Sequence, residues 1–406
     1  MKIIGKVPPW ILLCLFALSH STETAYTAAL PSISNYFSIS DSLAQITSSA
    51  YFAGFSLGIL SLGRVSDIFG RRPVILIGTS LYIVSSLIIA SLDDVWLLIF
   101  FRFVQAFGAS VGSVVGQAMA RDSYQGWQLS YIYASISMAM SFIPSLGSIV
   151  GGYIVEYLGW RHIFTFLGIV SALLLNMYIK YLPETNPYIG ASRNNRYYTV
   201  MKIALSDKIL LLYALIVGSF NGIMFGFYVE APFIFIDTLE MKPSNYGKLA
   251  FCITLASLVG SILNRRLVSS HVSTNKIVKA GLTLSIIGCI ALVGASFIDM
   301  VPENRKIIIF MIFIPMMLHM LGHSLVIPIA LRYALEDYAK VTGTAGSVFG
   351  SLYYMCVAII SFTISKIHSE TITKFTLLFF LLSATSSFAF YLIQKWHPIR
   401  KKFEFN

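Results

Sequence analysis

Twelve long apolar runs dominate this chain and decide what it can fold into. Each is about 20 residues or longer, the length that an α-helix needs to cross the hydrocarbon core of a bilayer. Backbone polar groups have no water to bind inside lipid, so such runs form helices and not open strands. The predicted spans cover residues 9–32, 44–65, 73–92, 95–120, 130–156, 160–182, 207–236, 245–268, 276–298, 306–332, 341–366 and 371–395.

The composition supports lipid as the solvent of the chain. Of its 406 residues, 56% are hydrophobic and 12% are charged, and the mean hydropathy is +0.76. An ordinary soluble domain carries about 25% charged residues. A chain this apolar cannot cover a water-facing surface, so we predict an all-α membrane protein.

The first apolar run has some features of a secretory signal. Lys2 and Lys6 precede the apolar residues 10–18, and small residues follow near Ala28. A cleaved signal peptide shows the same order of features. Because eleven further spans follow, we favour a retained first helix.

The formal net charge of +11 raises the question of a nucleic-acid partner. The basic residues are distributed by topology instead: with the N-terminus inside, inward-facing segments hold 21 Lys and Arg and outward-facing segments hold 7. Arg102 is the remaining one and lies within a span. This asymmetry is the positive-inside pattern of multi-pass membrane proteins. It predicts an inner-membrane protein with both termini in the cytoplasm and no nucleic-acid partner.

The longest polar connection divides the spans six and six. It covers residues 183–206 and contains prolines, arginines and asparagines. The predicted domains are therefore an N-terminal six-helix half (1–182), a cytoplasmic central loop (183–206) and a C-terminal six-helix half (207–406).

Two short sequence echoes favour duplicated halves. Residues 63–67 share a glycine-to-polar spacing with residues 260–264, and the run Gly-Ser-x-x-Gly occurs at 147–151 and again at 346–350. The two offsets, 197 and 199 residues, are nearly equal. Repeats of this kind indicate a transporter whose site lies between the two halves.

The strongest local pattern follows the second span. It reads Gly63-Arg64-Val65-Ser66-Asp67-Ile68-Phe69-Gly70-Arg71-Arg72-Pro73. Gly70 permits a tight turn, and Pro73 suits the first turn of the next helix. A plain positive-inside loop explains the arginines, but it explains neither Asp67 nor the spacing of the glycines.

This loop resembles the signature G-x-x-x-D-[RK]-x-G-R-[RK] of major facilitator superfamily transporters, with Ile68 at a position that is usually basic. Two further stretches resemble motifs of the same superfamily. The fourth-helix motif R-x-x-Q-G-x-G-A is matched by residues 102–109, with Ala106 for the first glycine. The antiporter-type motif of the fifth helix is matched by Pro144, Gly147, Gly151 and Gly152, followed by Trp160-Arg161 and Phe164.

Weaker echoes resemble one branch, the bicyclomycin-resistance-like (Bcr/CflA) drug:proton antiporters. They are Ala29-Leu30-Pro31-Ser32-Ile33, Asn264-Arg265-Arg266-Leu267 and Gly343-Thr344-Ala345-Gly346-Ser347. The resemblance implies the major facilitator fold and proton-coupled export of small amphipathic or drug-like compounds by alternating access. One departure concerns the acidic position of the first helix, which Thr24 occupies here. The carboxylate of Glu23 stands one residue earlier, a rotation of about 100° on a helix.

Two charged residues lie inside spans and are candidates for proton coupling. Glu23 is near the middle of the first span, and Arg102 is in the outer half of the fourth. Ionisable groups within a membrane are functional candidates by default. The resemblance adds Tyr26 and Gln105 to the same cavity. The alternative is a static Glu23–Arg102 structural pair.

A second candidate group is a gating loop at the cytoplasmic helix ends. Asp67 is expected to dock on the positive N-terminal end of the helix that opens with residues 343–347 when the inner gate is shut. The alternative is a solvated acid at a helix end. The loop comprises Gly63, Asp67, Gly70, Arg71, Arg72 and Arg121.

Three further residues have open interpretations. His319 and His323 share one helix face, which suits a polar cavity lining or a packing role better than a metal site because no third ligand is evident. Glu230 is expected either in the outer vestibule or as an ordinary interfacial acid. Because the two histidines lack a third ligand, the expected site holds no metal.

The expected function is proton-coupled secondary transport, and the nearest alternative is a proton-coupled importer of a metabolite on the same fold. An integral-membrane enzyme is disfavoured because the sequence has no metal-ligand cluster, nucleophile motif or phosphate loop. We expect no cofactor, with the proton gradient as the driving force. The expected partners are a small-molecule substrate, protons and membrane lipid, and the chain is expected to be monomeric.

Overall fold

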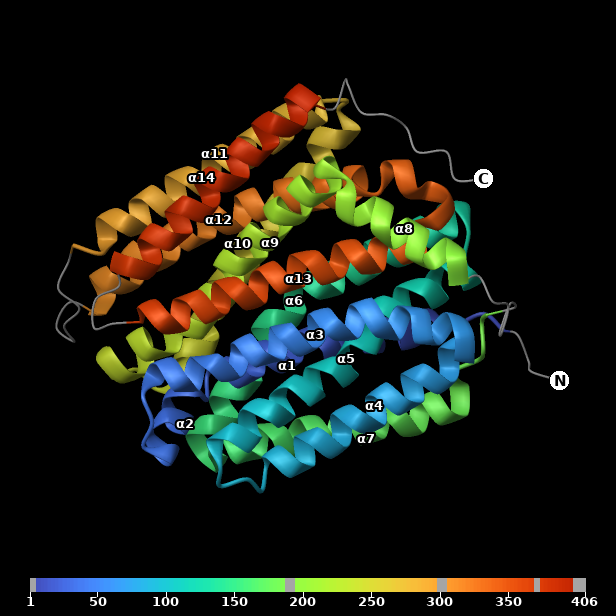
Figure 1. Cartoon of the computed structure of the whole chain (residues 1–406). Coiled ribbons are helices and arrows are strands. Elements are labelled where there is room, and N and C mark those ends of the chain that lie inside the picture. The colour runs from blue at the N-terminus through green and yellow to red at the C-terminus, as the bar shows by residue number, and fades with distance from the viewer. Residues whose placement is uncertain (1–4, 187–193, 298–304, 369–372, 397–406) are drawn as a thin grey trace.

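The computed structural model describes residues 5–186, 194–297, 305–368 and 373–396, and it is a bundle of long helices (Figure 1). The first predicted span forms two helices, α1 (Pro9–Thr27) and the short α2 (Leu30–Phe37). The other helices at predicted spans are α3 (Asp41–Phe69), α4 (Arg71–Ile89), α5 (Val95–Ser123), α6 (Gly126–Leu158), α7 (Arg161–Tyr181), α9 (Lys208–Pro232) with its π-helical extension η1 (Phe233–Thr238), α10 (Pro243–Ser269), α11 (Thr274–Ala295), α12 (Arg305–Ala334), α13 (Thr342–Ile367) and α14 (Thr373–Trp396).

The predicted spans and these helices agree. Within the described residues, ten helices are long and apolar enough to cross a membrane: α3, α4, α5, α7, α9 with η1, α10, α11, α12 with the residues after it, α13 and α14. At the other two predicted spans, polar residues from Ser19 to Thr24 interrupt the apolar run of α1, and α6 contains the apolar stretch Phe142–Leu158 among its described residues. A helix is therefore present at each of the twelve predicted ranges.

The long helices run back and forth along the bundle, so the bundle has two ends (Figure 1). At one end the backbone nitrogen of Gly5 donates to the Glu184 carbonyl at 3.3 Å, and Lys208 Nζ lies 5.5 Å from the Trp396 ring centre. The tight turn at Gly70, with φ of 101°, lies at the same end, which we call the Gly70 end. The opposite end is called the His368 end.

The earlier and later helices form two groups that meet along α3 and α13 and along α6 and α10 (Figure 1). Ser56 Oγ donates to the Ser351 carbonyl at 2.8 Å across the first contact. Across the second, a Cβ at position 247 would lie 2.5 Å from the Ser148 carbonyl oxygen, so only glycine permits this approach. Small residues thus set how closely the two groups pack.

The central connection differs from the predicted loop because it contains the helix α8 (Asn194–Ser206). Val200 and Ala204 lie one turn apart and are buried in a cluster with Ile209 and Leu210 of α9. On the other side, Tyr197 Oη donates to the Leu60 carbonyl of α3 at 3.3 Å. The polar composition hid this helix, since only a narrow apolar face holds it in place.

Candidate functional site

A buried ion pair joins α1 to α5. Arg102 Nη2 donates to Glu23 Oε2, and the two side chains are 0% and 2% exposed. A single charge is costly in such a dry place, whereas an opposite charge in direct contact offsets much of the cost. The structure thus brings together the two charged residues singled out in the sequence.

Arg102 also has polar and aromatic neighbours. Its Nη1 donates to Gln105 Oε1 at 2.8 Å, and Gln105 Nε2 donates to Ser86 Oγ at 2.8 Å. The guanidinium carbon lies 3.9 Å from the ring centre of Tyr26 and 4.3 Å from that of Tyr51. Two tyrosine faces therefore stabilise the cation by cation–π interaction. Tyr26 and Gln105 were expected here, while Tyr51 and Ser86 stood among many similar residues and carried no signal in the sequence.

The shift of the carboxylate by one residue has a visible consequence. Glu23 faces Arg102 on α5, whereas Thr24 faces α6, where a Cβ at Gly147 would overlap the Thr24 hydroxyl. The one-residue rotation therefore directs the acid into the interior of the first helix group and leaves a small side chain at the α1–α6 contact.

A cavity of about 420 Å³ lies between the two helix groups, and we call it the central cavity. Its volume falls within the roughly 300–1,000 Å³ usual for small-molecule sites. His20 of α1 and Pro144 of α6 line it from the first group. The later helices supply Val217, Asn221, Met224, Phe225, Tyr228, Ile253, Thr254, Ser257, Ser261, Met320, His323, Ser324, Ile327, Pro328, Leu331, Tyr353 and Tyr354.

A much smaller space, about 10 Å³, lies between this cavity and Glu23. Glu23 lines it, and so do three residues that also line the central cavity, namely His20, Phe225 and Tyr354. A space of this size is of the order of one water molecule. The buried carboxylate is therefore separated from the cavity by only one layer of side chains.

His20 has a defined orientation in that layer. Its Nδ1 lies 3.1 Å from the Phe16 carbonyl, which can only accept, so Nδ1 carries the hydrogen. Its Nε2 is then the acceptor for Tyr354 Oη at 3.4 Å. Neither His20 nor Tyr354 was predicted from the sequence, although His20 stands three residues before Glu23 and so on a similar side of the helix.

The signature loop forms a charged network at the Gly70 end. Arg71 Nη1 lies 2.5 Å from Asp67 Oδ1, and Arg71 Nε lies 3.2 Å from Asp122 Oδ2. Arg72 Nη2 donates to the Ile179 carbonyl at 2.7 Å. The backbone nitrogens of Arg71 and Arg72 donate to the Glu184 carboxylate at 2.9 and 3.1 Å, so Glu184 caps the start of α4.

Two residues of the predicted gating loop lie apart from this network. Arg121 Nη1 is 3.5 Å from Tyr133 Oη, and it is the next residue, Asp122, that joins Arg71. Gly63 lies between α5 and α13, where a Cβ on the glycine would lie 3.0 Å from Val114 Cγ2 and 3.6 Å from Ser347 Cβ. Asp67 binds Arg71 here, so its docking on the start of α13 stays a prediction for another conformation.

The antiporter-type motif lies where α6 crosses two other helices. Pro144 lines the central cavity. A Cβ at Gly147 or Gly151 would overlap α1, at Thr24 or Ala25, and one at Gly152 would overlap the backbone of α10. These glycines therefore allow α6 to pack against its own helix group and against the other group at once.

A second polar cluster lies at the His368 end. Glu230 Oε1 lies 2.9 Å from His368 Nδ1, and Gln45 Nε2 donates to Glu230 Oε2 at 2.8 Å. His368 Nε2 is 3.6 Å from Asp41 Oδ2. Burial lowers the pKa of His368, but its hydrogen bonds to Asp41 and Glu230 outweigh burial and raise the pKa to about 9. The cluster links α3 of the first group to α9 and the end of α13.

His319 and His323 differ in their surroundings. His319 is buried against Ser285 Oγ at 2.8 Å, whereas His323 lines the central cavity with Nε2 3.3 Å from Asn221 Oδ1. Among the residues that the structure describes, no group of three His, Cys, Asp or Glu is placed to hold a metal ion.

Comparisons with known proteins give a consistent result. A family model described as Major Facilitator Superfamily matches residues 12–363. A protein of Rickettsia bellii described as an uncharacterized transporter is 55% identical over 395 residues, covering 97% of this chain and 98% of the relative. A bicyclomycin resistance protein homolog of Haemophilus influenzae is 24% identical over 356 residues, covering 85% of each. The crystal structure of a D-xylose–proton symporter aligns with a TM-score of 0.76 at 15% identity, covering 95% of this chain and 96% of that one, which shows a shared fold.

Proposed function

The chain belongs to the major facilitator superfamily, and on that premise we propose that it is a proton-coupled antiporter that exports small amphipathic compounds. It works by alternating access between the halves 1–182 and 207–406, which the 183–206 segment connects. It is not an enzyme, and the proton gradient supplies the driving force.

The observation that carries the proposal is the position of Glu23 between a cation and the central cavity. Its carboxylate pairs with Arg102 on one side. On the other side, His20 and Tyr354 line both the small space beside Glu23 and the central cavity. A proton that reaches Glu23 cancels its charge and releases Arg102 from the pair. A substrate in the cavity and a proton on Glu23 therefore act on the same layer of side chains, which is the coupling that antiport needs.

The lining of the cavity supports an amphipathic substrate class. Aromatic and thioether side chains form much of its wall, including Phe225, Tyr228 and Met320. Asn221 and His323 supply a few fixed polar groups. Sites with apolar walls and few polar groups suit small amphipathic molecules. The resemblance to a bicyclomycin resistance protein homolog supports the same class.

The two ends of the bundle support alternating access. The Asp41–Gln45–Glu230–His368 cluster holds the helix groups together at the His368 end. The cavity reaches the later parts of α10 and α12, which run toward the Gly70 end. We assign the Gly70 end to the cytoplasm of the inner membrane from the distribution of Lys and Arg, so this conformation faces inward.

Orientation is tested by cysteine labelling at the Gly70 end. In intact cells, an impermeant thiol reagent should not reach a cysteine placed at Tyr198 of α8. The same reagent should label a cysteine placed at Glu240 at the other end. Labelling of the Tyr198 position from outside would reverse the assignment.

The transport function is tested with purified protein in liposomes that carry a proton gradient. A panel of amphipathic drugs and polar metabolites is offered, and compound and proton fluxes are recorded together. The proposal predicts that proton flow and compound flow run in opposite directions. Co-directional flow would establish an importer, and compound flow that is independent of the gradient would remove proton coupling.

A further inference from the structure

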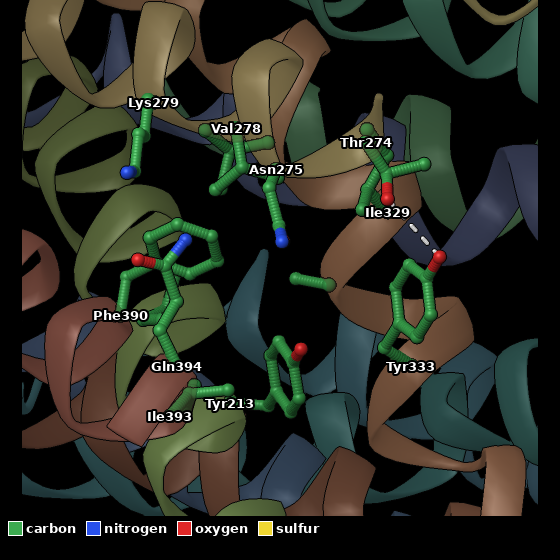
Figure 2. Close-up of a pocket in the computed structure, with 13 residues that line it drawn as sticks. Tyr213, Thr274, Asn275, Val278, Lys279, Ile329, Tyr333, Phe390, Ile393 and Gln394 are labelled. Atoms are coloured by element: carbon green, nitrogen blue, oxygen red, sulfur yellow. Dashed lines mark hydrogen bonds between the residues drawn. The ribbon is translucent and has the colours of Figure 1, made fainter. Parts of the chain in front are cut away.

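A second cavity, of about 510 Å³, lies within the later helices (Figure 2). Its walls come from α9, α11, α12 and α14 near the Gly70 end, and the described residues that line it differ from those of the central cavity. The two cavities lie on opposite sides of α9 and α12. On α9, Ile216 faces the second cavity and Val217 the central one; on α12, Val326 and Ile327 divide in the same way.

The inside of the second cavity is apolar. Val278, Ile329 and Phe390 form much of its surface, together with Ile393 of α14. All four are buried. A surface of this kind binds hydrocarbon by the hydrophobic effect.

One side of the cavity is polar and basic. Figure 2 shows the amide of Asn275 turned toward the open space, with Lys279 and Gln394 at its edge. Thr274 and Tyr333 close another side through a hydroxyl–hydroxyl hydrogen bond of 3.1 Å. None of the thirteen described residues that line the cavity is acidic.

Further basic side chains surround this end of the four helices. They come from the three other helices that form the walls, and they are Lys208 of α9, Arg332 of α12 and Lys395 of α14. Together with Lys279 they make the region attractive to anions. Basic pockets between transmembrane helices are typical sites for anionic lipid head groups, and long basic side chains reach the membrane interface from such positions.

We propose that the second cavity binds an anionic amphiphile, with its phosphate or carboxylate head at Lys279 and Asn275 and its chain along Ile329 and Phe390. An anionic phospholipid of the surrounding leaflet is one source of this chemistry, and a soluble organic anion with an apolar group is another. The occupant touches α9 and α12, which also wall the central cavity, so it stabilises that wall. This inference does not depend on the transported substrate or on proton coupling.

The test uses full-length protein in nanodiscs of phosphatidylcholine with graded amounts of phosphatidylglycerol. The protein is released from the nanodisc, and the lipid molecules that remain bound to it are counted by native mass spectrometry. Wild-type protein should retain phosphatidylglycerol in preference to phosphatidylcholine. Lys279→Gln should weaken retention about tenfold, since one charge-assisted hydrogen bond is lost. Lys276→Gln, which removes the same charge from the same helix outside the cavity lining, should leave retention near the wild-type value.

A second arm separates the two sources and the role of the apolar wall. Ala330→Trp fills the cavity and should abolish retention while Lys279 is intact; its melting temperature reports whether the variant is folded. If the occupant is a phospholipid, octyl phosphate should compete with phosphatidylglycerol. If the occupant is a soluble organic anion, phosphatidylglycerol should not be retained, and octyl phosphate should bind in a manner that depends on Lys279. Equal retention by Lys279→Gln and Lys276→Gln would overturn the proposal. So would displacement by inorganic phosphate at the concentration at which octyl phosphate acts, because the apolar wall would then be unused.

Discussion

Gln45 Nε2 lies 2.8 Å from Glu230 Oε2, and this hydrogen bond joins α3 to α9 at the His368 end. Both side chains are buried, and the same carboxylate holds His368 through its other oxygen at 2.9 Å. Gln45 and Asp41 stand on one helix group, and Glu230 and His368 on the other. Opening this end therefore requires the bonds between the groups to break.

Gln45→Leu should shift the bundle toward an opened His368 end. A hydrogen bond to a charged group contributes about 1.5–3 kcal/mol, so the open population should rise by about tenfold or more. Spin labels on cysteines at Trp96 and Lys374, one on each group, report the separation in a background without native cysteines. Tyr36→Phe is the control, because Tyr36 bonds to Asp93 at the same end within one group at 2.8 Å. An unchanged distance distribution in Gln45→Leu would show that the cluster does not hold this end closed.

The closed His368 end should also depend on pH. The pKa of His368 is raised to about 9 in this conformation, from an ordinary value of 6.5. A group whose pKa is raised by its partners stabilises that conformation fully below the ordinary value, and the stabilisation is lost as the pH rises through the raised value. The closed population should therefore be steady below about pH 6.5 and fall between there and about pH 9. His368→Gln should remove this fall in the same spin-label measurement; a fall that persists in the variant would assign it to another group.

Asp67→Asn should impair transport with little loss of folded protein. The carboxylate lies 2.5 Å from Arg71 at a partly exposed helix end, and such pairs contribute at most about 1 kcal/mol to stability. Transport rate and melting temperature are compared with those of Asp93→Asn, which removes a partly exposed Asp–Arg pair at the His368 end. A normal transport rate in Asp67→Asn would show that Asp67 has no role in gating and that the loop only sets the orientation of the chain in the membrane.

Arg102→Met should be far more damaging to the fold than Arg102→Met combined with Glu23→Gln. The single change leaves Glu23 buried with no cation, which costs about 3–5 kcal/mol, whereas the double change leaves no uncompensated charge. Melting temperatures in detergent provide the comparison. Equal destabilisation by the single and the double variant would mean that Glu23 finds another partner or solvent.

The fold was predictable from the sequence because long apolar runs, each sufficient to predict a helix, recur along the whole chain. Each predicted span is a long apolar run, and a helix lies at each of them. The contact of Glu23 with Arg102 was predictable because a charge inside a membrane needs a partner, and each half offered few candidates. The α8 helix was missed, since a mostly polar segment in which Val200 and Ala204 are the apolar anchors looks like a loop.

The polar surroundings of the site were less predictable. Glu230 was recognised as notable, but its link to Gln45 and His368 joins positions more than 100 residues apart, and no spacing along the chain encodes that contact. Arg121 was assigned to the charged loop, whereas its neighbour Asp122 makes the contact with Arg71. A shift of one residue along a helix turns the side chain by about 100°. A motif match therefore predicts which helix carries the contact, but it does not predict which residue of that helix makes it.

The most direct measurement concerns Glu23, because proton coupling is assigned to its carboxylate. Glu23→Gln keeps the shape of the side chain and removes its charge, and it should abolish transport driven by a pH gradient in liposomes. Substrate binding to the folded variant should also lose most of its pH dependence, since protonation can no longer compete with the substrate. The matched control is Glu240→Gln, an exposed acid at the His368 end outside the central cavity lining, and it should transport normally. Proton-driven transport at the wild-type rate by Glu23→Gln would contradict the mechanism and place the proton on another residue.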